Sequence, residues 1–151
     1  MRKFLALIAI FIASESFALD LPDKIQNWHL LSEDITPLTA GNKNFGRVVY
    51  RSYLRTSPRG TLDIILTEGS GAGNLYVPEC MKDSEGLFRP ASDYVVLNIS
   101  QKRAILERSE TLPLVLAIKA GDNITLTIET HALNESELIN FAGDLLSNVT
   151  K

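Results

Sequence analysis

Apolar and polar positions alternate through the middle of the chain, and this pattern predicts a β-rich domain. The segment 123–130 shows it most clearly, because Ile124, Leu126 and Ile128 alternate with threonines and a glutamate. The segments 48–55 and 62–66 alternate in the same way, and 94–99, 103–107 and 112–119 complete the set of expected strands. We therefore expect a sheet of about six strands.

The end of the chain changes from this period of two to the spacing of a helix. Asn134 is a natural N-cap, and Glu137 three residues later completes a capping box. The apolar residues that follow recur at helical spacing: Leu138, Phe141, Ala142, Leu145 and Val149. These positions predict an amphipathic C-terminal helix with one apolar side.

The lengths of the connections indicate how these elements pack. Short loops between successive strands favour antiparallel pairing, and an amphipathic helix buries its apolar side against one face of a sheet. The sequence predicts an α+β fold, a single two-layer domain over residues 19–151 with a mostly antiparallel sheet. Residues 22–28 are expected to form one helical turn, followed by a polar connection to Gly41.

The first 18 residues form a separate unit, which we interpret as a cleavable signal peptide. Arg2 and Lys3 precede the apolar run 4–13, and Ser16 and Ala18 are the small residues that a signal peptidase reads. The run has only about ten residues, whereas a membrane-spanning helix needs about 20. We expect cleavage before Leu19 and a periplasmic or secreted protein; the alternative is an uncleaved anchor.

The net charge of the mature chain indicates which classes of partner are not expected. The whole sequence has 15 basic and 18 acidic residues. Cleavage would remove Arg2, Lys3 and Glu15 with residues 1–18. The mature chain then has 13 basic and 17 acidic residues, a net charge of −4. No basic surface for nucleic acid is expected, and no stable membrane insertion after cleavage. The expected partner is a protein or a small ligand.

No motif predicts catalysis, a cofactor or a metal site. The glycine-rich run 69–74 lacks the Lys-Ser/Thr end of a phosphate-binding loop. The single cysteine, Cys80, has Lys82 nearby but no base adjacent in the sequence, and it cannot form an internal disulfide. His29 and His131 do not have the spacing of metal ligands. Catalytic, cofactor-binding and metal-ligating residues are therefore all predicted to be absent.

The long connection between Glu68 and Ser92 is the best candidate for a contact surface. It contains Tyr76 and Phe88 as aromatic anchors, Met81 as an adaptable contact and Arg89 as a charged one. Trp28 is the fifth candidate contact residue. Its alternative role is to anchor the N-terminal segment to the core.

Two segments of the chain resemble known groups of proteins in their sequence pattern. Its mature start, L-P-x-x-I-x-x-W over Leu21 to Trp28, looks like the start of several groups of secreted proteins of uncharacterised function. Its ending, a hairpin turned at 120–122 and an acidic-capped helix over 134–149, is similar to proteins of the PsbP/Mog1-like α+β fold. That resemblance implies an assembly factor, an accessory subunit or a binding module.

The function predicted from the sequence is an exported, non-enzymatic accessory or binding protein. Its main support is that no catalytic set converges on any motif. Two alternatives remain open: a small secreted hydrolase that uses carboxylates or Cys80, and a carrier of a small ligand.

Overall fold

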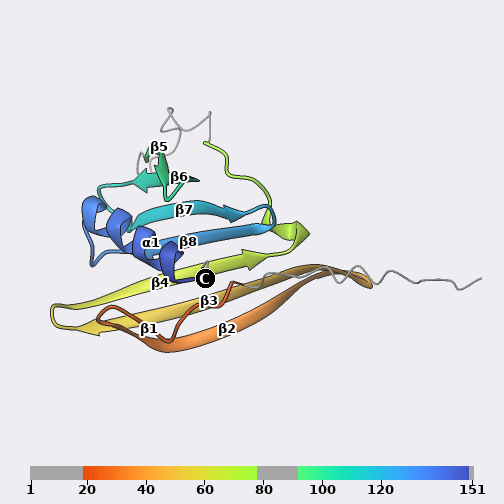
Figure 1. Ribbon diagram of the computed structural model, residues 1–151, viewed down its shortest axis with the longest axis horizontal. Helices are drawn as coiled ribbons and strands as arrows, with labels where there is room; N and C mark the ends of the chain where they lie inside the picture. The colour runs from red at the N-terminus through yellow and green to blue at the C-terminus, as the bar shows by residue number, and fades with distance from the viewer. Residues whose placement is uncertain (1–18, 78–91, 150–151) are drawn as a thin grey trace, which may run out of the picture.

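A computed structural model describes residues 19–77 and 92–149 of the protein. In this part of the chain one antiparallel sheet of eight strands carries a single α-helix (Figure 1). The strands are β1 (Lys24–Ile25), β2 (Trp28–Ala40), β3 (Lys43–Thr56), β4 (Arg59–Glu68), β5 (Asp93–Ile99), β6 (Lys102–Arg108), β7 (Leu114–Gly121) and β8 (Ile124–Thr130). A short 3-10 turn, η1 (Ser70–Ala72), follows β4, and the helix is α1 (Glu135–Val149).

The sheet consists of two meanders joined at its centre. Its strand order is β1-β2-β3-β4-β8-β7-β6-β5, so the chain moves from β4 to the far edge and returns strand by strand to β8. At the join Leu62 of β4 lies opposite Thr130 of β8, and Ile64 lies opposite Ile128. The pairing of β4 with β8 therefore makes one sheet out of two hairpin-connected halves.

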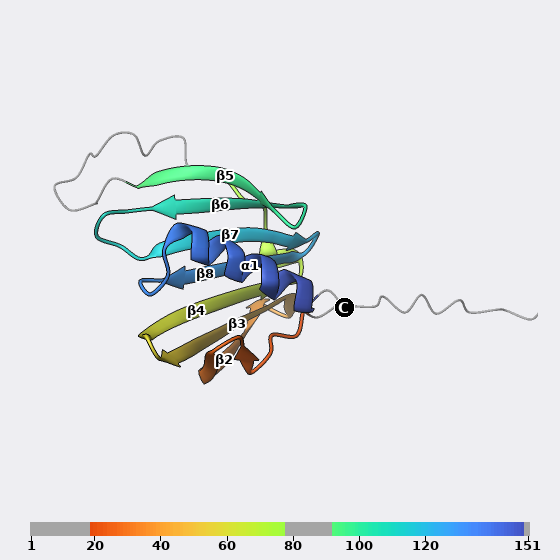
Figure 2. The same ribbon diagram turned by 60° about the vertical axis from the view of Figure 1, so that its left-hand side comes forward.

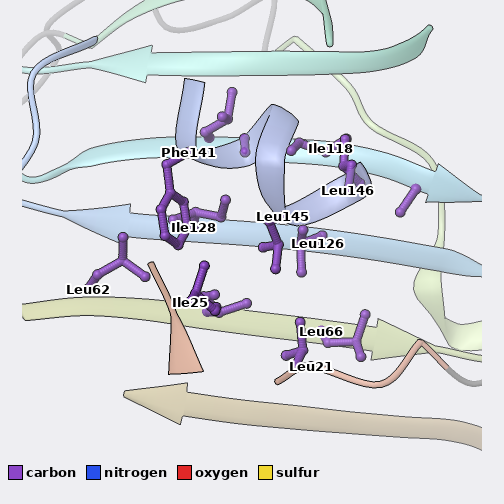
Figure 3. Close-up of a cluster of buried hydrophobic side chains, with 14 of the residues drawn as sticks. Leu21, Ile25, Leu62, Leu66, Ile118, Leu126, Ile128, Phe141, Leu145 and Leu146 are labelled. Carbon is purple, nitrogen blue, oxygen red and sulfur yellow. The ribbon is translucent and has the colours of Figure 1, made fainter. Parts of the chain in front are cut away.

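One face of the sheet is buried under α1 (Figure 2). Leu62, Ile64 and Leu66 of β4 are all buried, as are Leu126 and Ile128 of β8. From the helix Leu138, Phe141, Ala142, Leu145 and Leu146 join the same core. Figure 3 shows the side chains of Phe141 and Leu145 lying over Ile128 and Leu126. This contact confirms the predicted C-terminal helix and the apolar side on which it packs.

The start of α1 has the predicted cap. The Asn134 side-chain oxygen accepts a hydrogen bond from the backbone N–H of Glu137 at 2.9 Å. The Glu137 carboxylate in turn accepts one from the backbone N–H of Asn134, also at 2.9 Å. The two bonds satisfy donors that the first turn of a helix leaves without partners. The capping box read from the sequence is therefore present.

Trp28 lies in the core, with only 1% of its surface exposed. Its ring meets Phe141 edge to face, with 6.4 Å between the ring centroids and 74° between the planes. The Arg55 guanidinium lies over the ring, 4.5 Å from its centroid. Trp28 thus ties the N-terminal segment to the helix and the sheet, and it is not available as an exposed contact.

The fold class is confirmed as α+β, but the expected number of strands is wrong: the sheet has eight. The two additional strands are β1 and β2, which lie in the segment expected to be a helical turn and a polar connection. Most residues of β2 are exposed and one of them is Pro37, so neither alternation nor composition indicates a strand. Gln26 has a positive φ of 54° in the tight turn that pairs Ile25 with Trp28, which excludes the helical turn.

The β2–β3 hairpin crosses the end of β4 at a point where only glycine fits. Gly46 and Gly69 both have positive φ, at 123° and 101°. A Cβ on Gly46 would lie 1.7 Å from the backbone oxygen of Glu68, and one on Gly69 would lie 2.4 Å from that of Phe45. The two backbones therefore lie in direct contact at this point.

Truncation of Phe141 tests the docking of the helix. Phe141→Ala removes a buried ring from the contact with Trp28, and we expect a loss of about 3 kcal/mol or more in the free energy of unfolding, measured by urea denaturation. Asn140→Ala is the matched control, because Asn140 is exposed on the same helix, and it should change stability by less than about 0.5 kcal/mol. An unchanged denaturation midpoint for Phe141→Ala would contradict the packing described above.

Candidate functional site: the sheet face opposite the helix

The face of the sheet opposite α1, here the far face, carries a row of mainly apolar side chains. On β4, Leu62, Ile64 and Leu66 are buried on the helix side, so Asp63, Ile65 and Thr67 lie on the far face. The strand registers then align one residue from each of seven strands. This central row consists of Asp34, Tyr50, Ile65, Thr127, Ala117, Ile105 and Val96.

The neighbouring row on the far face carries negative charge. Asp63 of β4 lies directly opposite Glu129 of β8, and further along the row Glu107 of β6 lies opposite Tyr94 of β5. We call Asp63, Glu129 and Glu107 the acidic row. Like charges directly opposite each other on neighbouring strands destabilise a sheet. The pair Asp63–Glu129 is thus unfavourable for the fold.

No basic side chain compensates this pair in the part of the chain that the structure describes. The ion pairs found there are Arg47–Glu68, Arg51–Asp23, Arg51–Glu33, Arg108–Asp93 and Arg108–Glu135. All of them belong to the helix side of the sheet or to its edge next to α1, because Arg47, Arg51 and Arg108 share the strand face of the buried core residues. Within the described residues, neither Asp63 nor Glu129 forms an ion pair.

Two tyrosines lie beside the acidic row, and each contacts a carboxylate. The Tyr94 hydroxyl donates a hydrogen bond of 3.2 Å to Glu107. The pKa of Tyr50 is raised, chiefly by burial and further by a hydrogen bond to Asp63 and by the charges of Asp63 and Glu129. The pKa of Tyr94 is raised by burial and by the charge and hydrogen bond of Glu107. Both hydroxyls therefore remain protonated donors on a negative surface.

The chain after β4 crosses part of the far face. In Figure 2 it passes behind the sheet, on the side away from α1. The Thr125 hydroxyl donates to the carbonyl of Ala72 at 3.0 Å, and the Lys119 ammonium group donates to the carbonyl of Gly73. Both side chains share the strand face of Thr127. The crossing segment, residues 72–77, is thus attached to the far face beside the turn that joins β7 and β8.

The crossing segment contains one of the contact residues predicted from the sequence. Tyr76 is 77% exposed, as a partner contact requires. Met81, Phe88 and Arg89 lie outside the described residues, as does Cys80. His29 and His131 are exposed, one on β2 and the other just after β8. The predicted contact Trp28 is part of the core instead.

The acidic row is the feature that the sequence interpretation missed. Alternation correctly places Asp63 on the same face as Ile65, and it places Glu129 on the polar side of its own strand. What alternation does not give is the pairing of β4 with β8, two strands about 60 residues apart in the sequence. Only the register brings the two carboxylates opposite each other.

A small cavity lies on the other side of the sheet, next to the N-terminal segment. Its volume is about 160 Å³, and it is lined by Leu19, Asp20, Leu21, Glu33, Ile35, Arg47, Val49, Arg51 and Leu66. Pockets for small molecules usually measure about 300–1,000 Å³ and have mainly apolar walls. This cavity is smaller, and charged side chains form much of its lining.

Candidate metal sites and membrane-spanning helices are both absent from the described residues. No group of three or more His, Cys, Asp or Glu residues in that part of the chain has the geometry to hold a metal ion. Among its helices, none is both long and apolar enough to cross a membrane.

Comparison with known proteins does not assign the chain to a family. Models of protein families, curated proteins and solved structures all fail to match it. The resemblance to the PsbP/Mog1-like fold stays a prediction from the sequence.

Replacement of Asp63 tests the electrostatics of the far face. Asp63→Ala removes from Tyr50 both a hydrogen-bond partner and a negative charge that raises its pKa. The pKa of Tyr50 should therefore fall toward the ordinary value of tyrosine, while burial keeps it raised. Proton NMR of the tyrosine ring as a function of pH measures this shift. Glu107→Ala is the matched control and should lower the pKa of Tyr94 instead; an equal effect of both variants on Tyr50 would argue against the proposed contacts.

Proposed function

We propose that this protein is an exported, non-enzymatic binding protein and that its far face binds a protein partner with basic side chains. One observation carries the proposal: the cross-strand pair Asp63–Glu129, which has no compensating cation among the described residues. A local rule broken without compensation is expected mainly where function requires it. A Lys or Arg side chain of a partner would supply the missing charge.

The side chains around the acidic pair suit a protein partner. Tyr50 is 38% exposed and lies beside Ile65, so an aromatic ring and an aliphatic side chain are next to two carboxylates. Aromatic residues are enriched in protein interfaces because they combine apolar area with a polar group. A partner surface with apolar residues beside basic ones would complement both rows.

The crossing segment extends this surface. Thr125 and Lys119 attach it to the far face, and Tyr76 projects from it into solvent. The contact role proposed for Tyr76 from the sequence is therefore compatible with the same binding surface. In this arrangement the partner would meet Tyr50 and the acidic row on the sheet and Tyr76 on the segment.

The two alternative functions receive less support. A carrier of small ligands needs an enclosed apolar cavity, and the cavity beside Leu19 is small and charged. A hydrolase that uses two carboxylates needs them on both sides of a cleft. Asp63 and Glu129 lie side by side on one sheet face, and neither lines that cavity.

A photocrosslinking experiment on the exported fraction of the native host tests the proposal. A benzophenone amino acid at position 50 should crosslink one defined protein with a basic surface, and the yield should fall as salt concentration rises, because salt screens exposed charges. The variant Asp63→Asn/Glu129→Gln, which keeps the shapes of both side chains, should lower the yield at least about tenfold, the factor that corresponds to a loss of 1.4 kcal/mol.

The control variant carries Glu110→Gln and Asp122→Asn, which remove two exposed carboxylates from turns outside the far face. It changes the net charge by the same amount and should leave the crosslink unchanged. Equal losses in both variants would show that net charge alone attracts the partner. An unchanged crosslink in Asp63→Asn/Glu129→Gln would reject the acidic row as the binding surface.

A further inference from the structure

The backbone nitrogen of Leu19 lies against a buried carboxylate. The Leu19 nitrogen donates a hydrogen bond of 2.6 Å to Oε1 of Glu68 at the end of β4. Both residues are buried, each with 8% of its surface exposed. Few carboxylates are buried to this extent in proteins unless they are paired, because burial removes the water that stabilises their charge. Glu68 therefore needs strong partners.

Glu68 has one cationic partner among the described residues, and it is partly in water. Nε of Arg47 donates to Oε2 of Glu68 at 2.6 Å, and the Arg47 side chain is 43% exposed. Oε1, the other oxygen, faces the Leu19 nitrogen. If this nitrogen belongs to a peptide bond, it offers a dipole; if it is a chain terminus, it offers a full positive charge. Charge-assisted hydrogen bonds are about twice as strong as neutral ones.

The position of Leu19 is fixed by the residues that follow it. Leu21 is buried in the core beside Leu66 (Figure 3). The Tyr53 hydroxyl donates to the carbonyl of Pro22 at 2.9 Å, and Nη1 of Arg51 donates to the carbonyl of Leu21. Side chains of β3 thus hold this segment in place and present the Leu19 nitrogen to Glu68.

The sequence independently predicts that the same nitrogen becomes a chain terminus. Signal-peptide cleavage is expected between Ala18 and Leu19. We infer that Glu68 is the binding site for the α-ammonium group that cleavage creates at Leu19, so that removal of the signal peptide completes the fold. The inference rests on the proposed export of the protein.

The chemistry of this step is simple hydrolysis. Water adds across the Ala18–Leu19 peptide bond, catalysed by the signal peptidase of the exporting cell. The carbonyl carbon of Ala18 leaves as a carboxylate with the signal peptide, and the Leu19 nitrogen takes up protons to become an ammonium group. The ion pair Leu19–Glu68 then replaces a neutral N–H donor with a charged one.

A double-mutant cycle on purified protein tests the pairing directly. Two forms are compared: the mature chain, which begins at Leu19, and an extended chain that retains residues 16–18, which contain no charged side chain. Each is prepared with Glu68 and with Glu68→Gln. The mature chain should melt several degrees higher than the extended chain when Glu68 is present, and this difference should disappear in Glu68→Gln.

The pH dependence supplies a second readout that does not require the Glu68→Gln variant to fold. An α-ammonium group has an ordinary pKa of about 8, and a paired carboxylate raises it. The advantage of the mature chain should be complete below pH 8 and decline as the pH rises through the raised pKa of the folded state. The other charged groups near Leu19 are Asp20, Arg47, Arg51 and Glu33. They are the same in both chains, so the comparison removes their contributions.

Chemical reactivity is the third readout. The Leu19 amine of the mature protein should be acylated by a small reagent much more slowly than the exposed amine of Lys43, as measured by peptide mass spectrometry. Equal melting temperatures of the mature and extended chains, or a difference that persists in Glu68→Gln, would overturn the inference. So would an unprotected Leu19 amine.

Different results would refute the pairing of Leu19 with Glu68 and the proposed function of the far face. The intact mass of the protein processed by its native host shows whether the chain begins at Leu19. A mass that retains residues 1–18 would refute both export and the α-ammonium site. Loss of the far-face crosslink in the control variant would count against the proposed partner but leave the pairing of Leu19 with Glu68 intact.

Discussion

The pairing of β4 with β8 is the contact on which the rest of the structure depends. It joins a meander at the start of the chain to one at the end, and its helix-side residues lie under α1. β4 also carries the other features of interest: Asp63 and Ile65 on the far face, and Glu68 at its end. One strand thus forms the centre of the core, the middle of the proposed binding surface and the site that receives Leu19.

The parts of the fold that follow from local rules were predictable from the sequence. β8 alternates regularly, and α1 has both an apolar side and a capping box, so each is visible within fewer than 20 residues. β2 was not predictable in this way. Its residues are mostly exposed on both faces, so it is a strand because β3 pairs with it along its whole length, and this pairing leaves no periodic pattern in the sequence.

In the candidate site, too, some features follow from the local sequence and others depend on contacts between distant segments. The exposure of Tyr76 and the face of Asp63 agree with the local interpretation, whereas the opposition of Asp63 and Glu129 depends on a register between distant strands. The burial of Glu68 was not foreseeable either, because a glutamate at the end of a strand is usually exposed. Here Leu19, 49 residues away in the sequence, lies against it, and Arg47 forms an ion pair with it.

The carboxylates on the two sides of the sheet differ in their ion pairs, and this difference is the basis of the proposed binding surface. On the helix side Glu33, Glu68 and Glu135 each contact an arginine, as a stable fold requires of carboxylates near a core. On the far face Asp63 and Glu129 repel each other across neighbouring strands. Opposite charges at those two positions would contribute about 0.2–1 kcal/mol to stability, so the fold alone gives no reason for two acids. A basic partner does: it would gain from both charges at once, and the cost to the free protein would be recovered on binding.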